Sequence, residues 1–101
     1  MSKLFTIIAH DKADMQGVRA ELRQPHLDYF AQIMDQIAVA GPLRSDTGDV
    51  IGSLMIVKAD SADDARALLA NDPFAKAEIF ADVAVLPFAA ACGDWVGGKT
   101  W

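Results

Sequence analysis

Short apolar runs alternate with stretches of helical spacing along the chain, and together they predict a small α+β fold. Four apolar runs have the length of strands: residues 4–9, 39–43, 51–59 and 78–88. Three stretches have helical spacing of apolar residues: residues 14–22, 25–38 and 61–70. The predicted order is therefore β-α-β-β-α-β with a break in the first helix, which is the ferredoxin-like arrangement.

Capping and turn residues set the predicted helix boundaries. Asp14 is placed to cap the first short helix, and Pro25 suits the first position of the next one because that position needs no N–H. Ser61 followed by Asp64 resembles a capping box for the last helix. The segment 45–49 is rich in turn residues, so it is predicted to join two antiparallel strands.

Both faces of the predicted antiparallel four-stranded sheet are apolar. The last strand carries Val83 and Val85 on one side, and Phe80, Leu86 and Phe88 on the other. Two helices cover only one face, and a monomer would expose the other as a large apolar patch. We therefore expect a homodimer that buries the helix-free face.

The composition is that of one domain, and it excludes several classes of protein. The chain has 101 residues, of which 52% are hydrophobic, and we expect a domain over 1–90 with a tail over 91–101 that carries Trp95 and Trp101. No apolar stretch reaches the ~20 residues of a membrane span. The N-terminus lacks a secretion signal, and the lone Cys92 suits a reducing cytoplasm. Neither Cys92 nor the two histidines have the spacing of a metal site, so no metal is expected.

The charge pattern argues against nucleic-acid binding. The net charge is −5, and the nine basic residues are scattered along the chain. Nucleic-acid binders concentrate basic residues on one face, so this class of partner is not expected.

His26 and Asp72 are the candidates for acid/base chemistry. The partial positive charge of a helix N-terminus near His26 favours the neutral imidazole that a general base needs. A carboxylate on one ring nitrogen, here Asp72, would fix the tautomer. The residues alone leave the alternative open that His26 is a surface residue and Asp72 a turn residue before Pro73.

Arg23 and Ser53 are the candidates for substrate binding. Arg23 lies three residues before His26 and can bind an anionic group through two hydrogen bonds. Its alternative is a solvated arginine or a surface ion pair. Ser53 follows Gly52 on a central strand and can donate to a ligand, or it is a small buried strand residue.

Several motifs, taken together in their order, resemble the YciI-like (YCII-related) family. They are Arg23-x-Pro25-His26-Leu27, Ala40-Gly41-Pro42-Leu43, Gly52-Ser53, the helix start at 61–65, Asp72-Pro73-Phe74 and Leu86-Pro87-Phe88. The resemblance covers roughly residues 3 to 90. It implies a ferredoxin-like domain that pairs into a dimeric α/β barrel. It also implies a pocket in which His26 faces Asp72, with Arg23 and Ser53 nearby.

The resemblance implies acid/base chemistry on small aromatic or quinone-like molecules, without a cofactor. The leading interpretation is a cytoplasmic homodimeric enzyme of lyase, isomerase or dehydrochlorinase type, in which His26 transfers a proton and Asp72 orients it. One alternative is a non-catalytic dimer that binds a small molecule through His26 and Arg23. Another is a cofactor-free monooxygenase, which fold analogy alone supports.

Overall fold

The structure is a computed structural model that describes residues 3–101; residues 1 and 2, which the predicted domain includes, lie outside the described residues. The elements of the main body are β1 (Lys3–Asp11), α1 (Gln16–Glu21), α2 (Arg23–Gln32), the single-turn helix η1 (Met34–Gln36), β2 (Ile37–Arg44), β3 (Val50–Ala59), α3 (Ala62–Ala70), α4 (Pro73–Lys76) and β4 (Phe80–Phe88). The C-terminal segment holds β5 (Cys92–Gly93), the single-turn helix η2 (Asp94–Val96) and β6 (Gly98–Lys99).

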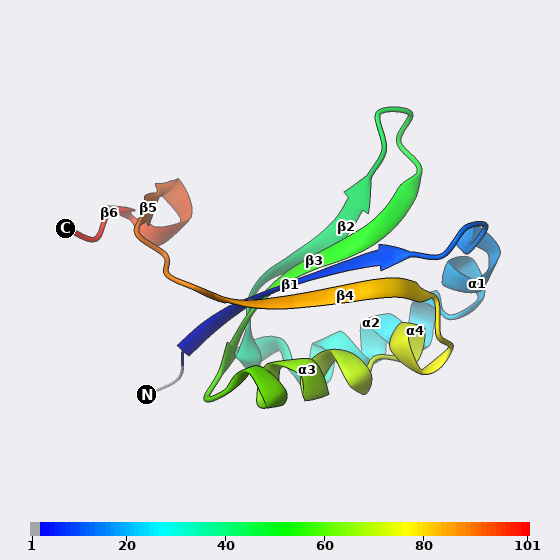
Figure 1. Ribbon diagram of the computed structural model, residues 1–101, viewed down its shortest axis with the longest axis horizontal. Helices are drawn as coiled ribbons and strands as arrows, with labels where there is room; N and C mark the ends of the chain where they lie inside the picture. Colours follow the sequence, from blue (N-terminus) through cyan, green and yellow to red (C-terminus); the bar gives the residue numbers. More distant parts are fainter. Residues whose placement is uncertain (1–2) are drawn as a thin grey trace.

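The main body is one antiparallel sheet with helices on one face. Its strand order is β2-β3-β1-β4, and every neighbouring pair is antiparallel. Figure 1 shows α2, α3 and α4 side by side beneath the sheet, while the helices of residues 3–101 leave the upper face uncovered. The predicted α+β, ferredoxin-like arrangement is confirmed.

Alternate residues of the two central strands form the core beneath the sheet. Phe5 and Ile7 of β1 pair with Val57 and Met55 of β3, and all four are at most 4% exposed. Successive side chains point to opposite faces of a strand, so this register sends the four toward the helices. Leu69 of α3, only 5% exposed, packs against them. The apolar contact between α3 and the central strands fixes the helix layer on which the candidate site is built.

The second helix begins and ends earlier than the sequence predicts. It starts at Arg23, so Pro25 is its third residue and His26 its fourth, rather than first and second. The His26 N–H donates to the carbonyl oxygen of the N-cap residue Leu22 at 3.1 Å, which is the first i→i−4 hydrogen bond of this helix. Pro25 is tolerated because the first three N–H groups of a helix have no partner within the helix. The predicted Asp14 cap is also wrong, since Met15 is the N-cap and makes no side-chain bond.

The helical spacing of Leu27, Phe30, Met34 and Ile37 predicts one core-facing stripe on this helix, and this prediction is only partly correct. Phe30 and Ile37 pack against the core, but Ile37 belongs to β2. Leu27 and Met34 are exposed by 39% and 61%. The helix ends at Gln32, and the helical spacing therefore stops before it reaches the last two positions of the stripe.

A change of register moves one aromatic side chain to the face opposite the predicted one. The pairing of β1 with β4 shifts between His10 and Asp11, so that Asp11 pairs with Phe80. Phe80 then packs against the core beneath the sheet, whereas the sequence pattern placed it with Leu86 and Phe88. A shift of one residue sends a side chain to the other face of the sheet.

The helix-free face and the tail both carry exposed apolar side chains. Leu86 and Phe88 are exposed by 54% and 43%, and the tail residues Trp95 and Trp101 by 84% and 74%. Figure 1 shows the tail beyond the end of β4, away from the helices. Cys92 is exposed in this tail.

Candidate functional site

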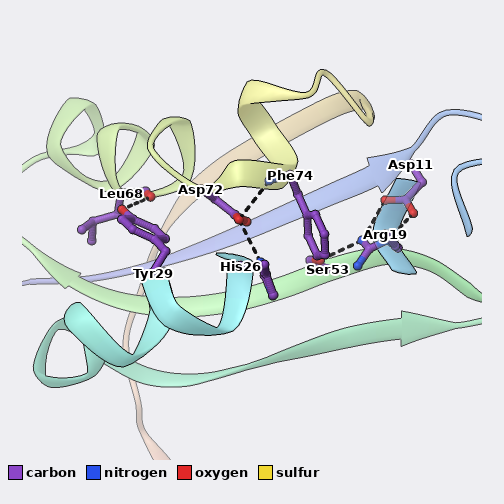
Figure 2. A network of polar contacts seen from close by, with 8 residues as sticks. All are labelled: Asp11, Arg19, His26, Tyr29, Ser53, Leu68, Asp72 and Phe74. Carbon is purple, nitrogen blue, oxygen red and sulfur yellow. Dashed lines mark hydrogen bonds and ion pairs between the residues drawn. The ribbon is translucent and has the colours of Figure 1, made fainter. Parts of the chain in front are cut away.

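A buried carboxylate and a partly exposed imidazole meet beneath the sheet. Nδ1 of His26 lies 2.8 Å from Oδ1 of Asp72, although the two residues are 46 positions apart. The Asp72 side chain is 2% exposed and the His26 side chain 20%. Figure 2 shows the two side chains pointing toward each other from α2 and from the junction of α3 and α4. The structure thus brings together the two residues that the sequence singles out for acid/base chemistry.

Asp72 is held in place by its role in the local backbone. It follows α3 and is the N-cap of α4, where its Oδ1 accepts a hydrogen bond from the Phe74 N–H at 3.1 Å. Pro73 occupies the first position of α4, where its missing N–H costs nothing. Aspartate is among the residues preferred at an N-cap, so the same side chain is both a cap and the partner of His26.

The hydrogen bond to Asp72 sets the tautomer of His26. An ionised carboxylate can only accept hydrogen bonds, so Nδ1 carries the proton and donates it to Oδ1. Nε2 is then the ring nitrogen with a free lone pair. Within residues 3–101, Nε2 makes no hydrogen bond to the protein. The ring is therefore fixed on its Nδ1 side, while its Nε2 side has no protein partner among these residues.

Two aromatic rings fix the plane of the imidazole. Phe74 stacks on His26 with ring centroids 4.0 Å apart and planes at 18°, and Phe30 contacts it at 4.6 Å in a tilted arrangement. Phe74 is 3% exposed, so it has little freedom to move. An imidazole held between such neighbours keeps its orientation without further hydrogen bonds.

An arginine that the sequence analysis did not select forms the other side of the site. Arg19 of α1 donates from Nε and Nη2 to the two carboxylate oxygens of Asp11, at 2.7 and 2.9 Å, and from Nη2 to Ser53 Oγ at 3.1 Å. Its guanidinium carbon lies 4.8 Å from the centroid of Phe74. In Figure 2 the Phe74 ring lies between His26 and Arg19. Arg19 and His26 lie on different helices, α1 and α2, so helical spacing in the sequence does not predict that they share a site.

The predicted substrate-binding residues lie in different environments. Ser53 of β3 joins the site through its hydrogen bond with Arg19. Arg23 is exposed and, in the described part of the chain, makes no side-chain hydrogen bond or ion pair. The contact of Arg23 with a ligand stays a prediction, while a guanidinium next to Ser53 is supplied by Arg19.

Tyr29 lies close to the buried carboxylate. Its hydroxyl donates to the Leu68 carbonyl oxygen at 2.5 Å, which ties α2 to α3. Burial, and secondly the negative charge of Asp72, raises the pKa of the Tyr29 phenol above its usual 10.0. Tyr29 is therefore a neutral hydrogen-bond donor at physiological pH.

A second histidine–aspartate pair is found on the opposite side of the sheet. Nδ1 of His10 lies 2.8 Å from Oδ1 of Asp82, but the two side chains are 56% and 69% exposed. Exposed pairs are weakly coupled because water screens them. The two pairs thus have the same contact distance, and burial distinguishes them.

Neither a metal centre nor a membrane span emerges from residues 3–101. No group of three or more His, Cys, Asp or Glu side chains there is arranged to hold a metal ion. In the same part of the chain, none of the helices has the length and apolar character needed to cross a membrane.

Solved structures resemble this fold at two levels of sequence identity. The 5-chloro-2-hydroxyhydroquinone dehydrochlorinase TftG of Burkholderia phenoliruptrix AC1100, solved in complex with 2,5-dihydroxybenzoquinone, superposes with a TM-score of 0.78 at 32% identity, covering 90% of this chain and 96% of that one. A NIPSNAP family protein of Agrobacterium tumefaciens strain C58 has a TM-score of 0.51 at 15% identity, covering 86% of this chain and 83% of that one, which is a likeness of fold alone.

The sequence comparisons agree with this likeness. Protein YciI of Escherichia coli O6:H1 and Protein YciI of Shigella flexneri are each 32% identical over 93 residues, covering 84% of this chain and 95% of the relative. A family model described as YCII-related domain matches residues 3–89, which leaves the tail with its two tryptophans outside the match. With this match over most of its length, the chain belongs to the YCII-related, or YciI-like, family.

Proposed function

We propose that the protein is an enzyme that moves protons on a small, hydroxylated aromatic or quinone-like molecule, with His26 as the general base and acid. The observation that carries the proposal is the 2.8 Å contact between His26 Nδ1 and the 2% exposed carboxylate of Asp72. A buried carboxylate that fixes the tautomer of an imidazole leaves Nε2 free to accept a proton. Asp72 then stabilises the imidazolium as it forms.

The solved structure of the dehydrochlorinase TftG supports this class of substrate. That enzyme acts on 5-chloro-2-hydroxyhydroquinone and was solved with 2,5-dihydroxybenzoquinone. At 32% identity and a TM-score of 0.78, the likeness includes the sequence as well as the fold. We infer that this chain also takes a planar ring with hydroxyl or carbonyl oxygens.

Loss of HCl from such a ring requires proton transfers and the departure of chloride, and neither step needs a cofactor. One hydroxyl proton moves to the ring carbon that carries chlorine, chloride leaves with the bonding electron pair, and a second hydroxyl proton is released. The two C–OH groups become C=O groups, and chloride takes away the two electrons, so no external oxidant is needed. A lyase or isomerase step on a related ring would use the same transfer through Nε2 of His26.

The dimeric α/β barrel is part of the same proposal. Leu86 and Phe88 on the helix-free face are exposed by 54% and 43%, and Thr6 on that face has a buried hydroxyl without a hydrogen-bond partner in residues 3–101. Pairing two sheets through this face would cover these apolar side chains. The exposed Cys92 suits a reducing compartment, so the cytoplasm is the location we expect.

Chloride release from 5-chloro-2-hydroxyhydroquinone under anaerobic conditions tests the proposal. The variant His26→Gln should lower kcat by about 10²–10⁴-fold, the usual contribution of one positioned acid/base group. The matched control is His10→Gln, because His10 makes the same 2.8 Å contact to an aspartate but is 56% exposed. This control should keep the wild-type rate.

Two outcomes would contradict the proposal. Equal rates for wild type and His26→Gln would remove His26 from the chemistry. Saturable binding of hydroxylated quinones, with no turnover of any chlorinated or isomerisable analogue, would instead identify a non-catalytic binding protein.

A further inference from the structure

The tail is a small hairpin whose hydrogen bonds join its own residues. Its strands β5 and β6 pair in an antiparallel ladder. The N–H and the hydroxyl of Thr100 both donate to the carbonyl oxygen of Ala91, at 2.9 and 2.8 Å. The turn between the strands contains Gly97 at a φ of 81°, which residues other than glycine rarely adopt. The sequence therefore specifies a defined shape for this segment.

The two largest side chains of this hairpin are left open to water in a single copy. Trp95 and Trp101, the two tryptophans of the chain, are 84% and 74% exposed. A two-stranded hairpin is at best marginally stable by itself in water, so it gains stability when its aromatic rings are buried. The tail thus needs an apolar surface that the described residues of one copy do not supply.

The tail and the helix-free face form one continuous apolar surface. On this face Leu4 pairs with Phe88, and Val39 pairs with Ile56. These four side chains and Trp95 contribute to the lining of a cavity of about 370 Å³ between the sheet and the hairpin. In Figure 1 the tail lies at the end of the sheet, on the side away from the helices. A partner that covers the helix-free face therefore also meets the tail.

We propose that the tail is a dimerisation arm, and that Trp95 and Trp101 of each copy pack on the helix-free face of a second copy. This inference rests on the pairing through that face in the proposed function, and it assigns the tail a part in that pairing. In a two-fold pair each contact is made twice, so four tryptophan rings are buried.

The area that these rings can bury is large enough for a specific interface. Since a buried tryptophan covers 150–250 Å², four rings with the observed exposure bury about 600 Å² of the tails. They cover a similar area of the two faces that receive them. The total reaches the ~1,200 Å² at the lower end of specific interfaces, before Leu86 and Phe88 are counted.

The charges favour a second copy over a lipid surface as the partner of the tail. The chain has a net charge of −5, so an anionic bilayer surface repels it. Within the tail the charged side chains are Asp94 and Lys99, which balance each other. Two copies can therefore meet at the tail without an excess of like charge there.

Tryptophan emission tests the inference, because both tryptophans of the chain lie in the tail. Wild type is diluted from micromolar to nanomolar concentration while its emission, its quenching by acrylamide and its mass are followed. In the dimer the emission should be blue-shifted and shielded from acrylamide. If the dimer dissociates in this range, the shielding should be lost at the concentration at which the mass halves.

Substitutions in the tail identify the side chains that make the contact. Trp95→Ser and Trp101→Ser should each raise the dissociation constant of the dimer about tenfold or more, as expected for a buried aromatic residue at an interface. Trp95→Phe and Trp101→Phe should dimerise close to wild type, and each leaves one tryptophan to report its own burial. The control is Met34→Ser, because Met34 of η1 is 61% exposed but lies outside the tail and the sheet. It should dimerise like wild type.

The outcomes distinguish this inference from the proposed function. A dimer whose tryptophans are quenched as readily as free tryptophan would overturn the role of the tail and leave the barrel standing. Shielded tryptophans in a monomer would show that the tail folds back on its own copy, and shielding only with anionic phospholipid vesicles would show a lipid partner. Either result would overturn the role of the tail.

Two further results separate assembly from chemistry. A wild type that is monomeric throughout would overturn the role of the tail together with the barrel, while the acid/base role of His26 keeps its own test in chloride release. His26→Gln should dimerise like wild type and lose turnover. Full turnover by this variant, with shielded tryptophans in its dimer, would refute the base and leave the role of the tail standing.

Discussion

Phe74 stacks on His26 with ring centroids 4.0 Å apart, and its backbone N–H donates to Asp72 at 3.1 Å. One residue therefore fixes both the plane of the imidazole and the direction of the carboxylate. The sequence Asp72-Pro73-Phe74 places the cap, the helix start and the stacking ring on consecutive positions. This short motif is thus the scaffold of the candidate site.

Replacing Phe74 with leucine should impair activity more than it impairs folding. Leucine keeps an apolar side chain and the backbone N–H, so unfolding should become easier by only about 1 kcal/mol. The lost ring stacking, worth about 0.5–1.5 kcal/mol, would let the imidazole tilt and lower kcat/KM by up to about tenfold. Urea unfolding and chloride-release kinetics measure the two effects. Full activity in a variant that is measurably less stable would show that the ring only fills the core.

The substitution Asp72→Asn should separate the two roles of this side chain, the N-cap of α4 and the negative charge beside His26. Asn is as good an N-cap as Asp, so Asp72→Asn should keep α4 and change stability by no more than about 1 kcal/mol. The variant lacks the negative charge that stabilises the imidazolium, and kcat should fall by about 10²-fold or more. Asp72→Ala is the comparison, because it removes the cap as well and should lower both stability and rate. A wild-type rate in Asp72→Asn would reduce Asp72 to a structural cap.

The fold was predictable because its signals are local and repeated. The positions of the four strands, the Ser61 cap and the turn over 45–49 agree with the structure: Ser61 Oγ accepts from the Asp64 N–H at 3.1 Å, and Ser45 N–H donates to the Asp49 carbonyl at 2.9 Å. The predicted place of Pro25 at the first helical position was wrong. A proline is tolerated at any of the first three positions of a helix, so the proline alone does not show where the helix begins. The face of Phe80 depended on a register shift that is a property of strand pairing and leaves no periodic signal.

The site was only half predictable. His26 and Asp72 were selected by residue type and motif, and the fold brings them to 2.8 Å. Arg19 was missed because its significance comes from Asp11, which follows a register shift at the end of β1, and from Ser53 on the neighbouring strand. A contact between three segments that are far apart in sequence has no local pattern, so it requires the tertiary structure.

Tyr29→Phe should change how stability depends on alkaline pH. Burial, and then Asp72, raises the pKa of Tyr29 above 10.0, so the folded state holds the phenolic proton more tightly than the unfolded chain does. This contribution is complete below pH 10.0 and is lost as the pH rises from there through the folded-state pKa. The variant has no phenol, so its stability lacks this pH-dependent contribution. The variant should also be less stable by about 1 kcal/mol at neutral pH, because the hydrogen bond to Leu68 is lost.

The measurement is the free energy of unfolding of wild type and variant from about pH 8 to about pH 11, where other groups titrate equally in both. The difference between the two should be constant at the lower end and should shrink at the upper end. A difference that stays constant throughout would mean that the Tyr29 hydroxyl has the same affinity for its proton in both states.

Gly52→Ala should destabilise the sheet next to the proposed ligand-binding serine. A Cβ at Gly52 would overlap the carbonyl oxygen of Ala9 on the neighbouring strand, so β1 and β3 would have to separate locally. We expect a loss of about 1–3 kcal/mol in the free energy of unfolding. Because Ser53 is the next residue and pairs with Ala9, its hydroxyl should also move away from Arg19 and weaken quinone binding.

Gly41→Ala is the matched control, since a Cβ at Gly41 on β2 would meet no atom within 4 Å. It should change the free energy of unfolding by less than about 0.5 kcal/mol. Equal stability of the two variants in urea unfolding would show that the strands adjust without cost. The glycine of the Gly52-Ser53 pair would then be needed for neither strand approach nor ligand binding. If only Gly52→Ala loses both stability and quinone affinity, close approach of β1 and β3 is what sets the position of the Ser53 hydroxyl.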